Sequence, residues 1–319
     1  MRNTVSGLVF DSIPVMLVNC YMRPSGTSLL KPELIARLKG IDFKARLVVE
    51  GFLSGLHRSP YKGFSVEFAE YRQYMPGDEL KRIDWRVYGR TGRFFVREYE
   101  EETNLRAYLV LDASASMNYP ATGYTKLDYG RWLAASLALL LNRQKDSTGL
   151  VTFSGKIDRY IPPRATGAHL RVLFRELENL KPGGETDIST TLHELAERIR
   201  RRGLVILISD LWDDATAVVA ALRHFRARKH ELLVFHLFHP DEATLGFSNP
   251  VLLRDLETEQ EITVDPRQIQ YQYQDRFNRR CEYFRRACAE TRVDYQSLST
   301  ATPFEETLFT YLERRRRLH

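Results

Sequence analysis

The sequence has few cysteines and no long apolar run, and each shortage excludes a class of protein. Its three cysteines, Cys20, Cys281 and Cys288, are too few for a disulfide framework, and none belongs to a Cys-x-x-Cys pair. We therefore expect a reducing, cytoplasmic location, with Cys281 and Cys288 acting as small buried hydrophobic side chains. The longest apolar runs, at residues 132–141 and 204–208, fall well short of the roughly 18 residues that span a bilayer. No integral membrane segment is predicted.

Motifs for nucleotide binding and for common hydrolases are also missing. There is no Gly-x-x-x-x-Gly-Lys-Ser/Thr loop, no Gly-x-Gly-x-x-Gly turn and no Gly-x-Ser-x-Gly elbow. His236 and His239 form a His-x-x-His pair, but the pair lacks the glutamate and the helical spacing of a zinc protease. We expect both histidines to have structural roles at the end of a strand, and we expect no bound nucleotide.

The positive charge is spread along the chain. The net charge of +6 allows a nucleic-acid hypothesis, because basic surfaces attract phosphate. The one dense cluster, residues 314–317, closes a predicted helix, where cations complement the negative end of the helix dipole. No aromatic residues are interleaved with these arginines to stack on bases, so no nucleic-acid partner is expected.

Strand-like and helical patterns alternate from residue 105 onward, which predicts an α/β fold with a doubly wound (Rossmann-like), mostly parallel sheet. The predicted strands are residues 105–111, 149–153, 204–209, 231–238 and 293–298. The predicted helices are residues 127–143, 169–177, 188–201, 215–228 and 268–291, with a final helix from Pro303 and an earlier one at 34–49.

These patterns divide the chain into four parts. Residues 1–28 are read as an untargeted extension, consistent with a start placed too far upstream, because Asp11 and Pro14 interrupt its apolar stretch and no cleavage site follows. The other expected parts are a smaller N-terminal segment at 29–104 with short strands and loops, the α/β domain at 105–302 with an excursion at 241–266 that contains a hairpin, and a C-terminal helix with an arginine-rich end at 303–319.

Oxygen-bearing side chains follow several of the predicted strands. Asp112, Ser114 and Ser116 come directly after the first strand, Thr186 precedes a helix, and Asp210 closes the strand LVILIS. Ligands of wound sheets bind outside the carboxyl ends of the strands, so these groups should meet at one edge. Carboxylate and hydroxyl oxygens suit Mg²⁺ or Mn²⁺ better than zinc or copper. An alternative is that Asp112 or the serines simply cap the following helix.

The spacing of these five residues resembles the metal-ion-dependent adhesion site (MIDAS) of von Willebrand factor A (vWA) domains. Residues 57–104, which begin HRSPYKGFSVEFAEYRQYMPGDELKRIDW, immediately precede LVLDASASM. That segment is similar to the signature of the domain of unknown function 58 family. The family comprises bacterial proteins often found beside MoxR-type AAA+ ATPases, and the resemblance covers the chain from about residue 30 onward.

The resemblance implies a vWA-type fold with a metal held by Asp112, Ser114, Ser116 and Thr186, directly or through water, and by Asp210 mainly through water. Two carboxylates leave Mg²⁺ undercompensated and one coordination position filled by water. The Asp or Glu of a protein partner could displace that water. Asp187 adjoins the site, where we expect it to cap the next helix rather than to support the metal.

The charged segment at residues 67–85 allows two interpretations. Its opposed charges suggest an ion-pair network around a turn at 75–78. It is either a family-specific surface that docks the ATPase or a structural clasp that joins this segment to the sheet.

Two functional hypotheses follow. The first is a metal-dependent protein-interaction module, acting as an adaptor or co-chaperone of a MoxR-type ATPase and not as an enzyme. The second is a metal-assisted phosphatase or hydrolase that uses the same strand edge, with Asp112 as its nucleophile. Such an enzyme would need a second acid two residues later, where the sequence has Ser114.

Overall fold

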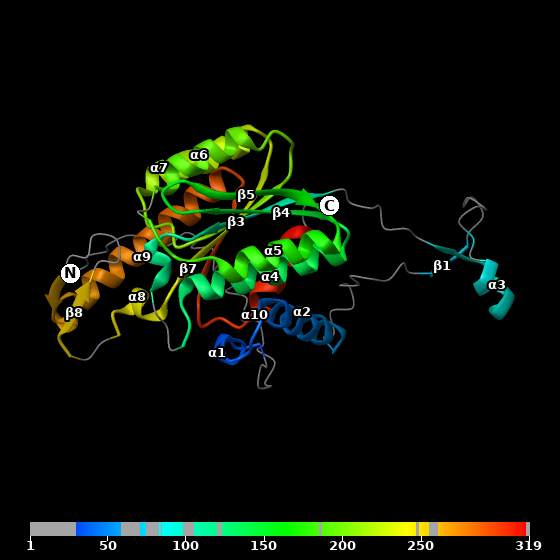
Figure 1. Ribbon diagram of the computed structural model, residues 1–319, viewed down its shortest axis with the longest axis horizontal. Coiled ribbons are helices and arrows are strands. Elements are labelled where there is room, and N and C mark those ends of the chain that lie inside the picture. The colour runs from blue at the N-terminus through cyan, green and yellow to red at the C-terminus, as the bar shows by residue number, and fades with distance from the viewer. Residues whose placement is uncertain are drawn as a thin grey trace, which may run out of the picture.

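The computed structural model describes residues 30–58, 71–74, 83, 85–97, 105–119, 123–184, 187–246, 249–254 and 261–316 (Figure 1). Its centre is a six-stranded sheet with the order β10-β7-β6-β3-β4-β5. Every neighbouring pair in this sheet is parallel except β4 and β5, which are antiparallel. The strands are β3 (Arg106–Asp112), β4 (Ser147–Phe153), β5 (Ile157–Arg164), β6 (Leu204–Ser209), β7 (Glu231–Phe238) and β10 (Asp294–Ser299). This order confirms the predicted doubly wound, mostly parallel fold.

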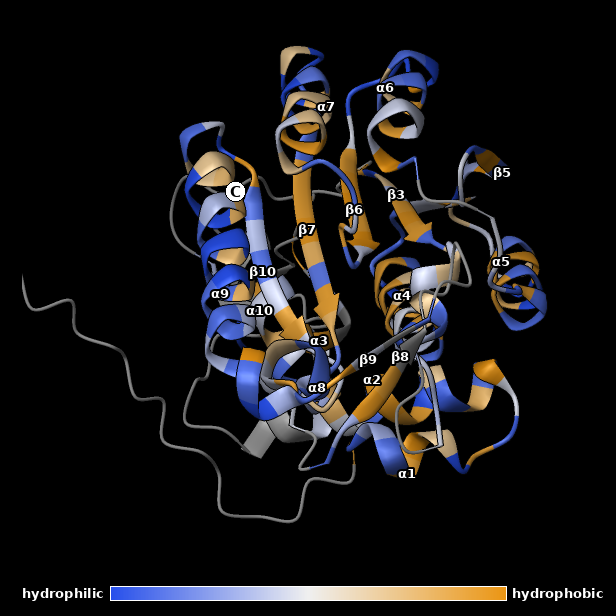
Figure 2. Ribbon diagram, turned by 90° about the vertical axis from the view of Figure 1, so that its left-hand side faces the viewer, coloured by the Kyte–Doolittle hydropathy of each residue, from blue (hydrophilic) through white to orange (hydrophobic). Residues whose placement is uncertain are grey.

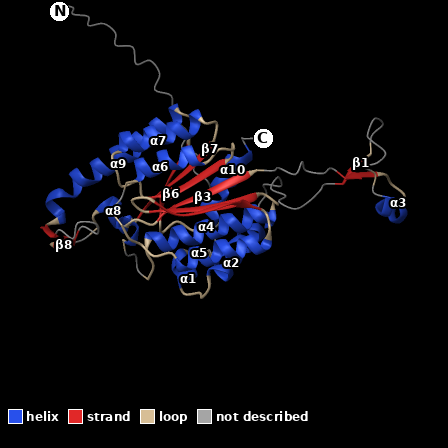
Figure 3. Cartoon of the chain, turned by 45° about the horizontal axis from the view of Figure 1, so that its top comes forward, coloured by secondary structure: helices blue, strands red, loops and turns tan. Residues whose placement is uncertain are grey.

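Helices cover both faces of the sheet (Figure 3). Buried residues on one face pack against α1 (Pro32–Ala36), α2 (Ile41–Arg58), α4 (Lys126–Arg143), α5 (Gly167–Asn179) and α10 (Phe304–Arg316). Buried residues on the other face pack against α6 (Ile188–Arg198), α7 (Ala215–Ala227) and α9 (Pro266–Glu290). A strand buried on both faces needs apolar side chains at nearly every position, which explains the apolar run 204–208 of β6 and the largely apolar β7, which is interrupted by His236 (Figure 2).

Alternation along β3 divides its side chains between these two cores. Leu109 and Leu111 belong to the core beneath α4, whereas Tyr108 and Val110 belong to the core beneath α6 and α7. Successive side chains of a strand point to opposite faces, so one seven-residue strand contributes to both layers. The strand is thereby fixed in position up to its last residue, Asp112.

Two boundaries differ from the prediction. The helix predicted over 34–49 is two helices, α1 and α2, separated by Gly40, whose φ of 79° lies in the left-handed region where glycine is favoured. The antiparallel edge strand β5 was not predicted. It contains Pro162 and Pro163, which a sequence reading treats as strand breakers but which an edge strand tolerates.

The excursion after β7 contains a short helix and a hairpin. Helix α8 (Pro240–Thr244) follows β7 directly, and β8 (Val251–Arg254) pairs with β9 (Glu261–Val264) in an antiparallel register. This two-stranded pair is separate from the main sheet, which confirms the predicted hairpin.

The N-terminal segment also contains short strands, as expected. β1 (Tyr71–Gln73) pairs antiparallel with β2 (Phe95–Arg97), and α3 (Trp85–Thr91) lies between them in sequence. Most of the charged segment at 67–85 falls outside the described residues, so both interpretations of it stay open. Among the helices that the structure describes, none combines the length and the apolar character needed to cross a bilayer.

The close contact at Gly203 gives a test of this packing. A Cβ atom at Gly203 would lie 2.3 Å from the backbone oxygen of Arg106, so backbone must shift to admit it. We expect Gly203→Ala to lower the free energy of unfolding by about 1–3 kcal/mol in urea denaturation. Gly167→Ala is the control, because nothing lies within 4 Å of its Cβ position. Equal stabilities of the two variants would contradict this packing.

Candidate metal centre

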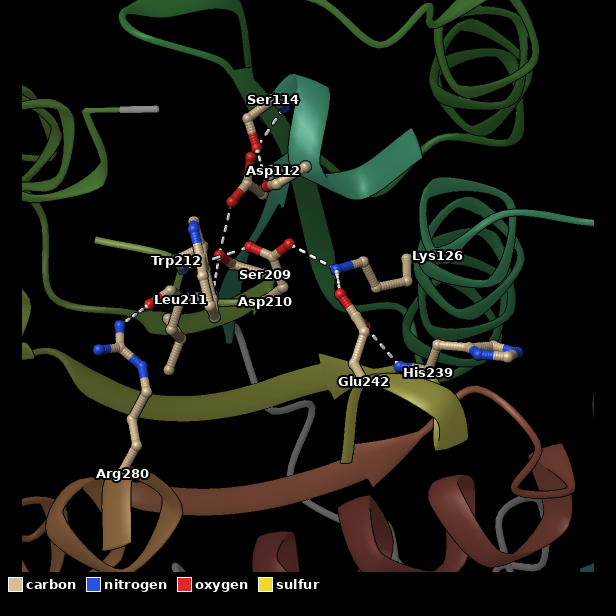
Figure 4. Close-up of polar contacts among 11 residues, drawn as sticks. Asp112, Ser114, Lys126, Ser209, Asp210, Leu211, Trp212, His239, Glu242 and Arg280 are labelled. Atoms are coloured by element: carbon tan, nitrogen blue, oxygen red, sulfur yellow. Dashed lines mark hydrogen bonds and ion pairs between the residues drawn. The ribbon is translucent and has the colours of Figure 1, made fainter. Parts of the chain in front are cut away.

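The carboxyl ends of two neighbouring strands bring the predicted acids to one edge of the sheet. β3 pairs in parallel with β6, so Asp112 at the end of β3 and Asp210 just after β6 lie at the same edge. Both side chains are buried, with relative exposures of 0% and 4%. The hydroxyl of Ser209, beside Asp210, donates a hydrogen bond of 2.6 Å to Oδ2 of Asp112 (Figure 4). The structure therefore joins segments that are 97 residues apart.

The two predicted serines lie beside these acids. The backbone N–H of Ser114 donates to Oδ1 of Asp112 at 2.9 Å, and the hydroxyls of Ser114 and Ser116 are 3.0 Å apart. Ser116 also interacts with Asp210 through its hydroxyl. Ser114 precedes the short 3₁₀ helix η2 (Ala115–Asn118), but its side chain makes no capping hydrogen bond. The serine hydroxyls are thus directed to the site, and the capping alternative does not describe them.

Thr186 lies outside the described residues, but the chain on each side of it is anchored at the same edge. Before it, Gly183 donates a backbone hydrogen bond of 2.9 Å to Ala113, and Ala115 donates one of 3.4 Å to Gly184. After it, the backbone N–H of Ser189 donates to the carboxylate of Asp213 at 3.0 Å. The loop that carries Thr186 therefore starts and ends beside the strand-end loops of β3 and β6.

Asp187 begins α6, as expected. Its Oδ1 accepts a hydrogen bond of 3.0 Å from the backbone N–H of Thr190, which identifies Asp187 as the helix cap. Its side chain thereby satisfies one of the free N–H groups in the first turn.

The two buried acids have different partners. Asp210 accepts a hydrogen bond of 2.8 Å at Oδ2 from Nζ of Lys126, the first residue of α4. Lys126 also donates to Oε1 of Glu242 at 2.6 Å, and Oε2 of Glu242 accepts from the backbone N–H of His239 at 2.7 Å. Among the residues that the structure describes, no basic side chain is paired with Asp112. Asp112 is therefore the carboxylate that lacks a cation.

The pKa directions follow from these partners. Burial is the main cause that raises the pKa of Asp112 to about 7, and the charge of Asp210 adds to the rise. Burial alone would also raise the pKa of Asp210, but the charge and the hydrogen bond of Lys126 hold it below its ordinary value. Burial would lower the pKa of Lys126, yet Asp210 and Glu242 raise it, so the ammonium stays charged.

Lys126, Glu242 and Ser209 were not among the predicted site residues. Ser209 precedes Asp210 in the sequence, so its proximity could have been noticed. Lys126 and Glu242 lie 84 and 32 residues from Asp210 along the chain, and no spacing pattern links them to it. Their contacts arise because α4, β6 and α8 all reach this edge of the sheet.

A clamp holds the loop after β6. Arg280 of α9 donates to the backbone oxygens of Leu211 at 2.5 Å and of Asp213 at 2.6 Å. Leu211 is fully buried with a φ of 52°, a strained conformation for a residue other than glycine. The indole of Trp212, between them, is 59% exposed. The backbone is therefore held on both sides of Trp212, whose ring is exposed.

The other predicted features have structural roles. His236 is buried and bonds to the hydroxyl of Tyr295 at 2.6 Å through Nδ1, and His239 caps α8. Cys288 is buried in the core, as expected, whereas Cys281 is only partly buried. Among the described residues, no group of three or more His, Cys, Asp or Glu side chains could hold a metal ion. The predicted site is of another kind, with two carboxylates and several hydroxyls.

Together, the sheet and this edge define a doubly wound α/β module with a buried, oxygen-rich site. The chain belongs to the family described as "Protein of unknown function DUF58", whose model matches residues 70–283. Uncharacterized proteins of Mycobacterium bovis and Mycobacterium tuberculosis are each 29% identical to it over 240 residues, which are 74% of this chain and 75% of theirs.

Solved structures that align with the chain include a conserved hypothetical protein and a von Willebrand factor type A protein. The conserved hypothetical protein BatB from Bacteroides thetaiotaomicron aligns with a TM-score of 0.43 and 14% identity, over 67% of this chain and 99% of BatB. A von Willebrand factor type A protein from Catenulispora acidiphila aligns with a TM-score of 0.34 and 15% identity, over 43% of this chain and 34% of that one. The likeness is distant, so the fold assignment depends on the strand order of the chain itself.

The buried His236 predicts how stability depends on pH. Burial lowers its pKa to about 4, from an ordinary value of 6.5, so the unfolded chain binds more protons between these values. We expect this histidine to stabilise the fold above pH 6.5 and to lose up to about 3 kcal/mol of that contribution as the pH falls to 4.

Urea denaturation from pH 7 to pH 4 measures this loss. His236→Gln should flatten the pH dependence relative to the wild type, and His193→Gln, at an exposed histidine, is the matched control. If the free energy of unfolding of His236→Gln depends on pH as that of the wild type does, His236 is not the residue that causes the loss of stability.

Proposed function

We propose that this protein is a metal-dependent protein-interaction module. In this proposal Asp112, Ser114, Ser116, Thr186 and Asp210 hold Mg²⁺ or Mn²⁺, and the ion attracts an Asp or Glu side chain of a protein partner. The observation that carries the proposal is the buried Asp112 carboxylate, which has hydroxyl and amide donors around it but no cation among the described residues. A buried charge without a counter-charge is costly, and a bound cation would remove that cost.

The chemistry of the donors supports a hard divalent cation. The described members of the site offer only carboxylate and hydroxyl oxygens, which Mg²⁺ and Mn²⁺ prefer. When bound, the ion would supply a positive charge at a partly dehydrated point, to which an incoming carboxylate is attracted. The protein's own part is to fix the oxygens: Ser209 and the N–H of Ser114 orient Asp112, and Lys126 orients Asp210.

The surface beside the site suits a protein partner. Trp212 is exposed and its backbone is held by the Arg280 clamp, so its ring can make an apolar contact with little loss of freedom. A partner with an acidic residue flanked by an apolar one would match this arrangement.

The proposed biological role is that of an adaptor or co-chaperone for a MoxR-type AAA+ ATPase in the cytoplasm. Membership of the family supports the role, because proteins of this kind are expected beside such ATPases. No nucleotide-binding motif occurs in the sequence, so the energy for remodelling would come from the ATPase. No observation favours the hydrolase alternative, because Ser114 stands where a second acid would be needed.

Removal of the metal or of Asp112 should abolish partner capture. We expect the wild-type chain to retain the co-expressed ATPase, or a substrate of that ATPase, in Mg²⁺ but not in chelator. Asp112→Ala should fail in both conditions. The matched control is Asp42→Ala, which removes an exposed acid paired with Arg46 on α2. The proposal is refuted if the wild type captures the partner equally well in Mg²⁺ and in chelator, and Asp112→Ala captures it as well as the wild type does.

The role of Thr186 can be tested separately. Thr186→Val keeps the shape of the side chain but removes the hydroxyl, so we expect it to weaken Mn²⁺ binding on the order of tenfold or more in calorimetric titration. Thr190→Val, at an exposed threonine of α6, is the control and should bind Mn²⁺ as the wild type does. Equal affinities of the two variants would exclude Thr186 as a ligand.

A further inference from the structure

The burial of Lys126 is the least expected feature of this edge. Its side chain is only 3% exposed, although it carries a positive charge. It is also the first residue of α4, where the helix dipole favours negative rather than positive groups. A buried ammonium at this position is tolerated only because other charges compensate it. The compensating groups therefore indicate what the lysine does.

Two carboxylates from different elements supply that compensation. Nζ of Lys126 lies 2.8 Å from Oδ2 of Asp210, which follows β6, and 2.6 Å from Oε1 of Glu242 on α8. Glu242 cannot turn away freely, because its other oxygen accepts the backbone N–H of His239. The ammonium is thus held at a fixed point against Asp210 (Figure 4).

This contact makes the two acids of the site unequal. Both oxygens of Asp112 accept hydrogen bonds from uncharged donors, so its negative charge is not neutralised by them. One oxygen of Asp210 is already engaged by a full positive charge. A divalent cation that approached Asp210 closely would be repelled by the ammonium, and would compete with it for the same carboxylate.

We propose that Lys126 is a tethered cation that keeps Asp210 out of direct coordination of the metal. The site therefore binds the metal more weakly, but the bound metal still attracts an incoming carboxylate. The inference rests on the proposed metal site and adds a specificity-determining residue to it. Glu242 is the positioning residue that holds the ammonium in place. With one oxygen of Asp210 engaged by the ammonium, Asp112 is the acid left to contact the ion directly, which leaves a coordination position for a partner's acid.

Lys126→Met tests this role, because it keeps most of the side-chain stem and removes the charge. We expect Lys126→Met to bind Mn²⁺ on the order of tenfold more tightly than the wild type in calorimetric titration. The water-proton relaxivity per bound Mn²⁺ should fall, because the freed Asp210 replaces a coordinated water. The Lys126→Met/Asp210→Asn double variant should bind Mn²⁺ no more tightly than Asp210→Asn alone.

Two further variants keep the test decisive. Lys44→Met is the matched control, because Lys44 is another largely buried lysine, on α2, whose ammonium donates to the backbone oxygen of Ala36 and not to Asp210; it should show no tighter Mn²⁺ binding. Circular dichroism and thermal melting report whether each variant folds. If Lys126→Met does not fold, Lys126→Met/Glu242→Gln replaces it, because that variant leaves one fewer unpaired carboxylate beside the missing ammonium.

The outcomes separate this inference from the proposed function. If Lys126→Met binds Mn²⁺ and the wild type does not, Lys126 is supported as the competitor of the metal, and the metal-dependent function of the wild type fails. If the folded variant binds no more tightly than the wild type, or if neither binds, the inference is overturned. If Lys126→Met binds Mn²⁺ no more tightly than a wild type that does bind it, loss of capture by Asp112→Ala would still support the proposed function.

Discussion

The buried negative charge of Asp112 is the constraint on which the site depends. The residue ends a strand that is apolar on both faces, so its carboxylate cannot reach water and must be stabilised where it stands. Ser209 and the N–H of Ser114 each supply a hydrogen bond, and the parallel pairing of β3 with β6 places Ser209, the last residue of β6, beside Asp112. Uncharged donors reduce the cost of burial but do not cancel the charge. This residual charge is what makes the edge of the sheet a candidate cation site.

The neighbouring acid, Asp210, has a charged partner, so the two acids of the site are not equivalent. Asp210 is neutralised from within the protein by Lys126, which itself is held by Glu242. Two buried carboxylates close together would otherwise repel each other, and the ammonium relieves that repulsion without occupying both. The loop that contains Asp210 is fixed on its other side by Arg280, which also presents Trp212 to solvent. The orientation of the acids and the exposure of the Trp212 ring therefore depend on the same packed elements.

Much of the fold could be predicted because its signals are local. Apolar runs bounded by turns identified β6 and β7, and the alternation of strand and helix patterns identified the doubly wound sheet. The errors have physical causes of the same local kind: Gly40 divides one expected helix in two, and the prolines of β5 conceal an edge strand. The convergence of Asp112, Ser114, Ser116 and Asp210 could be predicted because strand ends of a parallel sheet meet at one edge, whereas Thr186 lies outside the described residues and the metal stays a prediction.

By itself, the sequence determined which segments form strands and helices, and which oxygen-bearing residues end the strands, since periodicity and turn residues act over a few positions. Only the tertiary structure decided which charges compensate one another. Lys126, Asp210 and Glu242 lie on three elements far apart in the chain, and their pairing depends on the docking of α4 and α8 against the end of β6. Such contacts result from the packing of whole elements, which no local pattern encodes, and they distinguish Asp210, which has a charged partner, from Asp112, which has none among the described residues.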